Sequence, residues 1–453
     1  MITGCREGFW AKVWDGLGGR LIMKTMFFLA IFGVVWGQLV AAPETGRAAA
    51  SIESVLTHDP EDQTIWPNQT SRANGDRWLV ENHDRIRQMR PRVLLVNFSN
   101  EHDEAHLEQL VTRLRVAVAE SSRYHGYANA EAPVFLQYEI FKCVDLRDRD
   151  RTTGDSRLVP LKDPTARDGF NMRYAAFFSD DFARHFGVKD PQQDDRFLRL
   201  DELLDRGYCH EVWLCLSGAP ESPWIGAYEV VELKPRYDAA FKSTPGDFVQ
   251  AGNGGDPAQP WTGRSVRIGA INASRGVGCF LESLAHGLEG MSSAEAIPYF
   301  TRYFRDYAGF NLKEKYKAPF DSLYGVQYGR SDVQYPDANT LIARHGVTEF
   351  KIDSYVCTGG NAHFPPSGRR HYDLDNTAPV LSTIEDWRIG SGPEGRDVAK
   401  PFTNAAFSQY REMAPDCMGP WLVYWRQNMP GLDNRQKDAD GRPMKNWWPF
   451  LFY

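Results

Sequence analysis

Apolar and polar runs between positions 92 and 143 predict a strand, a helix and a second strand. Arg92–Phe98 is a mostly apolar run bounded by turn-forming residues, as expected of a strand covered on both faces. His106–Ser121 places leucines and valines on one helical stripe, and Pro133–Cys143 is the next apolar run. This order favours a three-layer α/β sandwich built on a mixed or mostly parallel sheet.

The same reading extends the sheet further along the chain. Glu211–Ser217 and Arg264–Ala270 are predicted as buried strands, and Gly226–Leu233 as a strand that pairs with the first of them. Glu229 has apolar neighbours in that strand and faces either solvent, which we favour, or a cleft. Gly276–Gly290 then follows as a helix bounded by glycines.

The first 42 residues have the three parts of a secretory signal. Arg20 and Lys24 precede the uncharged apolar run Met26–Val40, and Ala41-Ala42 follow it. This run is shorter than the roughly 20 apolar residues that a spanning helix needs. We therefore expect cleavage after Ala42, a secreted or periplasmic mature protein, and no stable membrane span after cleavage. The true start is either Met1 or Met23.

The expected parts of the chain follow from these patterns. Beyond Phe310 the sequence becomes rich in loops and aromatic residues, whereas the segment after the signal is polar and is expected to be a tether or a surface arm. The four parts are a leader and signal peptide at 1–42, a polar arm at 43–77, an α/β core domain at 78–310, and a loop-rich aromatic C-terminal region at 311–453 packed on the core.

Charge and cysteine content narrow the function. The net charge is −7 and no stripe of lysine and arginine is present, so a nucleic-acid partner is not expected. Of the seven cysteines Cys5 leaves with the leader, and the even remainder in an exported chain permits disulfides. We expect a Cys357–Cys417 disulfide, because both residues lie in the loop-rich C-terminal region.

The helix at 276–290 carries the sharpest candidate site. Glu282, His286 and Glu289 are spaced at i, i+4 and i+7, which brings all three to one side of a helix. Two carboxylates and an imidazole suit a divalent metal, zinc foremost, or a polar substrate. The expected metal ligands are therefore His286, Glu289 and Glu282. The alternative is a solvated helix face with one Glu–His pair.

A second candidate is the segment Thr358–Ser367, in which two glycines and two prolines stiffen a loop around Asn361 and His363. Rigid loops commonly present catalytic or ligating groups. We expect His363 to share one site with His286, and Glu282, His363 and Asn361 to be catalytic. Alternatively, Asn361 and His363 satisfy backbone groups of the loop.

The run Glu282-Ser-Leu-Ala-His286-Gly-Leu-Glu289 resembles the active-site helix of zincin metallopeptidases, which carries His-Glu-x-x-His. In that register Glu282 and His286 stand at the two ligand positions, and Ser283 stands at the general base. The resemblance implies a zincin-like fold and a zinc ion, but without the group that activates water for peptidase chemistry. This helix and the segment around His363 also resemble secreted bacterial proteins of unknown function.

These features lead to two hypotheses about function. The first is a secreted hydrolase that acts on extracellular peptide or polysaccharide and depends on a metal; without a metal, Glu282 and Glu289 would form an acid/base pair. The second is a non-catalytic cell-surface protein that binds carbohydrate or peptide through aromatic loops. Its candidate stacking residues are Trp387, Trp421, Trp425, Trp447 and Trp448.

Overall fold

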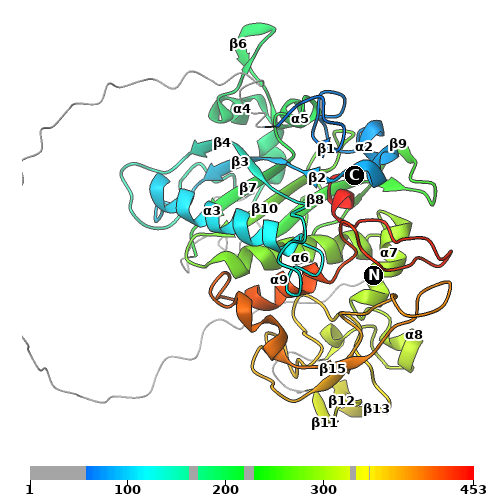
Figure 1. Ribbon diagram of the computed structural model, residues 1–453. Helices are drawn as coiled ribbons and strands as arrows, with labels where there is room; N and C mark the ends of the chain where they lie inside the picture. Colours follow the sequence, from blue (N-terminus) through cyan, green and yellow to red (C-terminus); the bar gives the residue numbers. More distant parts are fainter. Residues whose placement is uncertain (1–57, 163–171, 219–228, 327–332, 346) are drawn as a thin grey trace, which may run out of the picture. The chain divides into compact units, whose positions relative to one another are not determined.

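The computed structural model describes residues 58–162, 172–218, 229–326, 333–345 and 347–453 (Figure 1). The expected leader and signal peptide, at 1–42, lie outside the described residues. Among the helices that the structure describes, none combines the length and the apolar character needed to cross a bilayer.

A six-stranded sheet forms the centre of the fold, in the order β4-β3-β7-β10-β8-β9. The first four strands in that order are parallel, and the last two join antiparallel. Every residue of β3, β7 and β10 is buried, which explains their continuous apolar sequences. The strands are β3 (Arg92–Asn97), β4 (Glu139–Asp145), β7 (Glu211–Leu216), β8 (Val230–Tyr237), β9 (Ser243–Gln250) and β10 (Val266–Asn272).

Helices cover both faces of this sheet, so the expected α/β sandwich is confirmed (Figure 1). Val93 and Leu95 of β3 belong to one hydrophobic cluster, whereas Leu94 and Val96 belong to another. The first face holds α3 (Glu104–Ser121), α6 (Val277–Ser293), α7 (Pro298–Tyr307) and α9 (Gly419–Gln427), and the second holds η2 (Tyr174–Phe178), α4 (Asp180–Phe186) and α5 (Leu200–Asp205).

Helix α6 follows β10 after only a short turn, and a distant residue caps its start. The Asp416 carboxylate accepts hydrogen bonds from the backbone N–H groups of Gly276, Gly278 and Cys279 at 3.0, 2.8 and 3.1 Å. A Cβ at Gly278 would lie 1.9 Å from the Asp416 carbonyl oxygen, so only glycine permits this approach. The segment before α9 therefore fixes where α6 begins.

The C-terminal region adds its aromatic residues to the same core. The five tryptophans that were candidates for stacking on sugar rings, most of which we expected to be core residues, are at most 5% exposed, so they pack in the interior and do not form a binding platform. Most of the elements here are short. They are α8 (Leu312–Tyr316), η3 (Leu323–Gly325), β11 (Gln334–Asp337), β12 (Thr340–His345), β13 (Thr348–Ile352), β14 (Val380–Ser382), β15 (Lys400–Phe402), η4 (Asn404–Tyr410) and η5 (Trp448–Phe452).

The arm before the core is packed from residue 58 onward, so this part of it agrees with a surface arm rather than a tether. Trp66 is fully buried, and the Asn74 amide donates to the carbonyl oxygens of His210 and Ser265. A polar segment can pack in this way because its amides satisfy strand-end carbonyls. The remaining short elements are β1 (Ile65–Trp66), α2 (Arg77–Glu81), η1 (His83–Arg85), β2 (Gln88–Met89), β5 (Lys189–Asp190) and β6 (Gln193–Phe197).

The predicted Cys357–Cys417 disulfide is absent, because both thiols are free in the structure. Cys357 lies in a hydrophobic cluster with Leu341 and Phe364 of the C-terminal region. Cys417 instead follows Asp416, the distant residue whose carboxylate caps the start of α6. Sequence proximity within one loop-rich region therefore did not predict proximity in space.

Candidate metal centre

Helix α6 and the loop between β13 and β14 bring three candidate ligands together. Glu282 and His286 lie one turn apart on α6, and His363 reaches them from the loop. The ring centroids of His286 and His363 are 5.0 Å apart, so the expectation that they share a site is confirmed. One ligand atom from each of the three residues lies within 4.8 Å of the other two, and the group could hold a metal ion.

The distances within this group suit a small divalent cation. His363 Nε2 lies 2.7 Å from Glu282 Oε1, and His286 Nε2 lies 3.8 Å from the same oxygen. Ligand atoms around a tetrahedral zinc ion are separated by about 3.4 Å when each bond is about 2.1 Å. The Glu282 side chain is only 2% exposed, and both histidines are largely buried. Small movements would therefore bring all three atoms to bonding distance.

Hydrogen bonding directs the ring of His286. Its Nδ1 lies 2.9 Å from Glu289 Oε2. Because a carboxylate only accepts, Nδ1 carries the hydrogen, and the lone pair of neutral His286 is on Nε2, facing Glu282. Glu289 is itself held by the Tyr324 hydroxyl, at 3.2 Å from each oxygen, and by the Ala362 N–H at 3.0 Å.

Glu289 therefore occupies a different place from the one expected of a metal ligand. Three residues after His286, its carboxylate reaches the Nδ1 side of that ring, whereas the ligand atoms meet on the Nε2 side. A carboxylate in this position fixes the tautomer and orientation of a ligating histidine. His363 takes the third ligand position that the helical spacing assigned to Glu289.

The ring of His363 is directed in the same way by a second histidine. His363 Nδ1 lies 2.9 Å from His371 Nδ1. Burial, together with the neighbouring His363, lowers the pKa of His371 to about 4, so His371 is neutral at pH 7, and either of the two facing Nδ1 atoms can donate to the other. When His363 donates from Nδ1, the lone pair of its Nε2 faces the Glu282 carboxylate oxygen at 2.7 Å. Two acceptors at this distance repel unless a proton or a metal ion lies between them.

Charge complementarity within the cluster is strong. Burial opposes the charge on Glu282, yet the two neighbouring histidines and the Tyr372 hydroxyl outweigh burial and lower the pKa of Glu282 far below its usual value. Burial likewise opposes the charge on His286, but its hydrogen bonds to Glu282 and Glu289 raise its pKa well above the usual value. Glu282 is therefore ionised and His286 is protonated at pH 7, and a bound metal ion would displace the proton from His286.

Glu229 also faces this group, so the solvent-facing orientation that we favoured from the sequence is wrong. Its Oε2 lies 3.6 Å from His286 Nε2 and is buried without a hydrogen-bond partner among the described residues. Burial raises the pKa of this carboxyl. A buried acceptor without a partner needs an explanation, such as an ion or water that belongs at the site.

Asn361 shapes the loop that carries His363. Its Oδ1 accepts from the backbone N–H groups of His363 and Phe364 at 3.2 and 3.1 Å, and its carbonyl oxygen accepts from Trp421 Nε1 at 2.8 Å. These are the loop-satisfying contacts that the sequence left as an alternative. Asn361 therefore positions the loop that carries His363. The other two residues of the predicted catalytic set, Glu282 and His363, contact each other directly.

Sequence reasoning assigned no role to three residues that complete the site. The Tyr372 hydroxyl donates to Glu282 Oε1 at 2.6 Å and lies 3.1 Å from His363 Nε2. His371 and Tyr372 follow His363 closely along the chain, and that proximity is a usable signal. Tyr324 lies in a short 3-10 turn far along the chain from Glu289, and no local pattern marks it.

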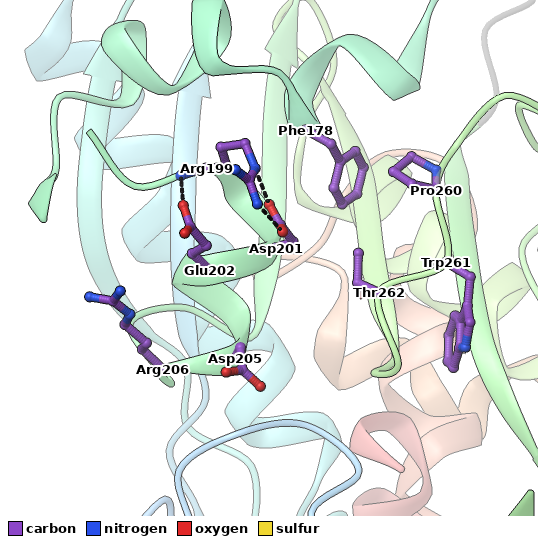
Figure 2. Close-up of a pocket in the computed structure, with 9 residues that line it drawn as sticks. All are labelled: Phe178, Arg199, Asp201, Glu202, Asp205, Arg206, Pro260, Trp261 and Thr262. Atoms are coloured by element: carbon purple, nitrogen blue, oxygen red, sulfur yellow. Dashed lines mark hydrogen bonds and ion pairs between the residues drawn. The ribbon is translucent and has the colours of Figure 1, made fainter. Parts of the chain in front are cut away.

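A separate cavity of about 490 Å³ opens beside α5, on the opposite face of the sheet (Figure 2). Phe178 and Trp261 contribute aromatic walls, and none of the lining residues belongs to the metal cluster. Its charged groups are already paired, since Arg199 binds Asp201 through two hydrogen bonds at 3.0 and 2.9 Å. This cavity therefore offers few unpaired polar groups to a ligand.

Comparison with protein-family models, with curated proteins and with solved structures finds no match to this chain. The evidence for function is therefore the chemistry of the site itself.

Proposed function

We propose that this chain binds one zinc ion between Glu282, His286 and His363 and uses it to hydrolyse extracellular peptide or polysaccharide. The observation that carries the proposal is the convergence of two imidazoles on one carboxylate oxygen. Each imidazole has its Nδ1 engaged by another side chain, which leaves Nε2 for a cation.

The donor set favours zinc over harder cations. Two of the three ligands are imidazole nitrogens, which are borderline donors that suit zinc, whereas calcium and magnesium prefer oxygen alone. Three protein ligands with a fourth position left for water or substrate are typical of catalytic zinc sites. The carboxylate behind His286 supports the same interpretation, because ligating histidines commonly donate their other N–H to a carboxylate.

When bound, such an ion supplies Lewis acidity, which activates water and polarises a substrate oxygen. The general base would be Glu229, whose raised pKa and buried Oε2 beside His286 place it to accept a proton from water. Ser283, which stands at the zincin base position, turns back toward the Cys279 carbonyl oxygen at 3.4 Å. The Tyr372 hydroxyl can donate to negative charge that develops on the substrate.

The burial of the five tryptophans weakens the alternative of a carbohydrate-binding surface protein. That hypothesis depended on exposed aromatic loops, and these residues instead pack in the core. The buried, charge-rich cluster favours the enzyme.

Zinc binding tests the proposal directly. Protein stripped with a chelator and titrated with zinc should take up one ion per chain. His286→Ala and His363→Ala should each weaken zinc binding by about 100-fold or more, and Glu289→Gln by about 10- to 100-fold. His185→Ala, at an exposed histidine of α4, is the matched control and should bind as the parent does. A parent protein that binds no zinc, or histidine variants that bind it equally well, would contradict the proposal.

A further inference from the structure

Two of the free cysteines meet at the start of α6. The Cys417 thiol lies against the Cys279 thiol, and this contact, together with burial and the Glu282 carboxylate, raises the pKa of Cys417, while the Arg275 guanidinium donates to Cys417 Sγ. Cys279 is buried, whereas Cys417 is only half-buried and is open to a reagent from solvent.

The backbones on either side of these thiols are in direct contact. The Asp416 carboxylate accepts the Cys279 N–H at 3.1 Å, and a Cβ at Gly278 would lie 3.0 Å from the Gly419 Cα. A disulfide requires Cα atoms within about 7 Å and Cβ atoms that face each other. The contact between the thiols and the contact between the flanking backbones bring the two cysteines into the range in which such a bond can form.

The other described cysteines lie in different surroundings. Cys209, Cys215 and Cys357 are each buried in a separate hydrophobic cluster, and Cys143 is exposed on the edge strand β4. The contact at the start of α6 therefore distinguishes Cys279 and Cys417 from the rest.

We propose that Cys279 and Cys417 form a disulfide when the chain meets a disulfide oxidant. The Cys417 thiolate attacks one sulfur of the oxidant, forms a mixed disulfide and releases the first thiol. The Cys279 thiolate then attacks Cys417 Sγ, and the second thiol leaves. Two protein thiols are oxidised and one oxidant disulfide is reduced, so atoms and electrons balance. The proposal does not depend on the metal site.

The bond would join the start of α6 to the segment before α9 and close a loop of roughly 140 residues, which includes the His363 loop. Closing a loop of that length lowers the entropy of the unfolded chain, and for a protein of this size it should raise the midpoint of thermal unfolding by about 5 °C.

Oxidised glutathione is the probe that tests this bond. After treatment of the folded chain, mass mapping under non-reducing conditions should recover a Cys279–Cys417 cross-linked peptide. The thermal midpoint should rise and should return on reduction. Cys279→Ser and Cys417→Ser should each lose the shift, whereas Cys357→Ser, at a buried cysteine outside the pair, should keep it.

Mapping the unmodified chain keeps the test decisive even if a serine variant folds poorly. Recovery of Cys279 and Cys417 as free thiols or as separate glutathione adducts would overturn the proposal. Recovery of a Cys357–Cys417 peptide would overturn it as well, and would restore the pairing expected from the sequence.

Discussion

At the scale of single residues, one residue of the site has an unfavourable backbone conformation. Tyr372 has a φ of +62°, in the left-handed region that non-glycine residues seldom adopt. Such a conformation costs on the order of 1 kcal/mol and is often found at functional sites. This conformation places the Tyr372 hydroxyl against Glu282 and His363. The strained residue is therefore one that contacts the proposed metal ligands.

Tyr372→Phe removes that hydroxyl and keeps the ring. If the hydroxyl stabilises developing charge, kcat on the substrate identified by a peptide and polysaccharide panel should fall by about 100-fold while zinc affinity stays within a few-fold of the parent. Tyr316→Phe is the control, because its hydroxyl donates only to the Val356 carbonyl oxygen in the C-terminal region. Unchanged turnover in Tyr372→Phe would show that the hydroxyl takes no part in the reaction.

Glu229 supports a second prediction at this scale. Glu229→Gln should retain zinc and lose turnover by about 100- to 10,000-fold, because the amide accepts no proton from water. Turnover by the parent enzyme should fall as the pH drops through the raised pKa of Glu229, since the base must be ionised to act. Ser283→Ala, at the zincin base position, is the control and should retain activity. Full activity in Glu229→Gln would show that Glu229 is not the general base.

At the scale of elements, the sequence predicted helix α6 well and its surroundings poorly. Glycine-bounded periodicity placed the helix at Gly276–Gly290, and the structure has it at Val277–Ser293. Helical spacing correctly placed Glu282 and His286 together, because that relation is local. It misassigned Glu289, whose role depends on Tyr324 and Ala362, two residues far away along the chain.

The Asp416 cap is likewise invisible to local sequence patterns, and it can be tested by mutation. Asp416→Ala leaves three N–H groups at the start of α6 without their acceptor, and should lower the free energy of unfolding by about 2 to 4 kcal/mol. Asp103→Ala removes a cap on α3 that accepts a single N–H, from His106, and should cost about 1 kcal/mol. Urea unfolding of both variants measures the difference, and equal losses would show that Asp416 is an ordinary cap.

At the scale of the whole molecule, strands were predictable because continuous burial leaves a local signature. The C-terminal region was also expected to pack on the core, but the polar contacts that hold the arm and the end of the chain were not predictable, because they join distant segments. Lys234 shows this clearly, since its ammonium group is fully buried and donates to the carbonyl oxygens of Phe450, Leu451 and Tyr453. A lysine in a strand gives no sequence signal that it will hold the last helical turn of the chain.

His210 joins the arm to the sheet in a comparable way. It is fully buried, its Nδ1 accepts the Arg92 N–H at 2.8 Å, and its Nε2 lies 2.8 Å from the Arg72 carbonyl oxygen. Nδ1 accepts, so the ring is neutral and donates from Nε2. Burial, with a contribution from the charge of Arg92, lowers the pKa of His210 to about 3.

Acid should therefore weaken the fold through this residue. The unfolded chain binds the His210 proton near pH 6.5 and the folded chain binds it only near pH 3, so the stabilisation is complete above pH 6.5 and is lost as pH falls between these values. At pH 4.5 the loss should be about 2 to 3 kcal/mol. His210→Gln can keep the donor to Arg72 but does not titrate. Urea unfolding at pH 7 and pH 4.5 should show a smaller acid loss in His210→Gln than in the parent, by about that amount. Equal losses in the two proteins would mean that His210 is not held neutral by the packed arm.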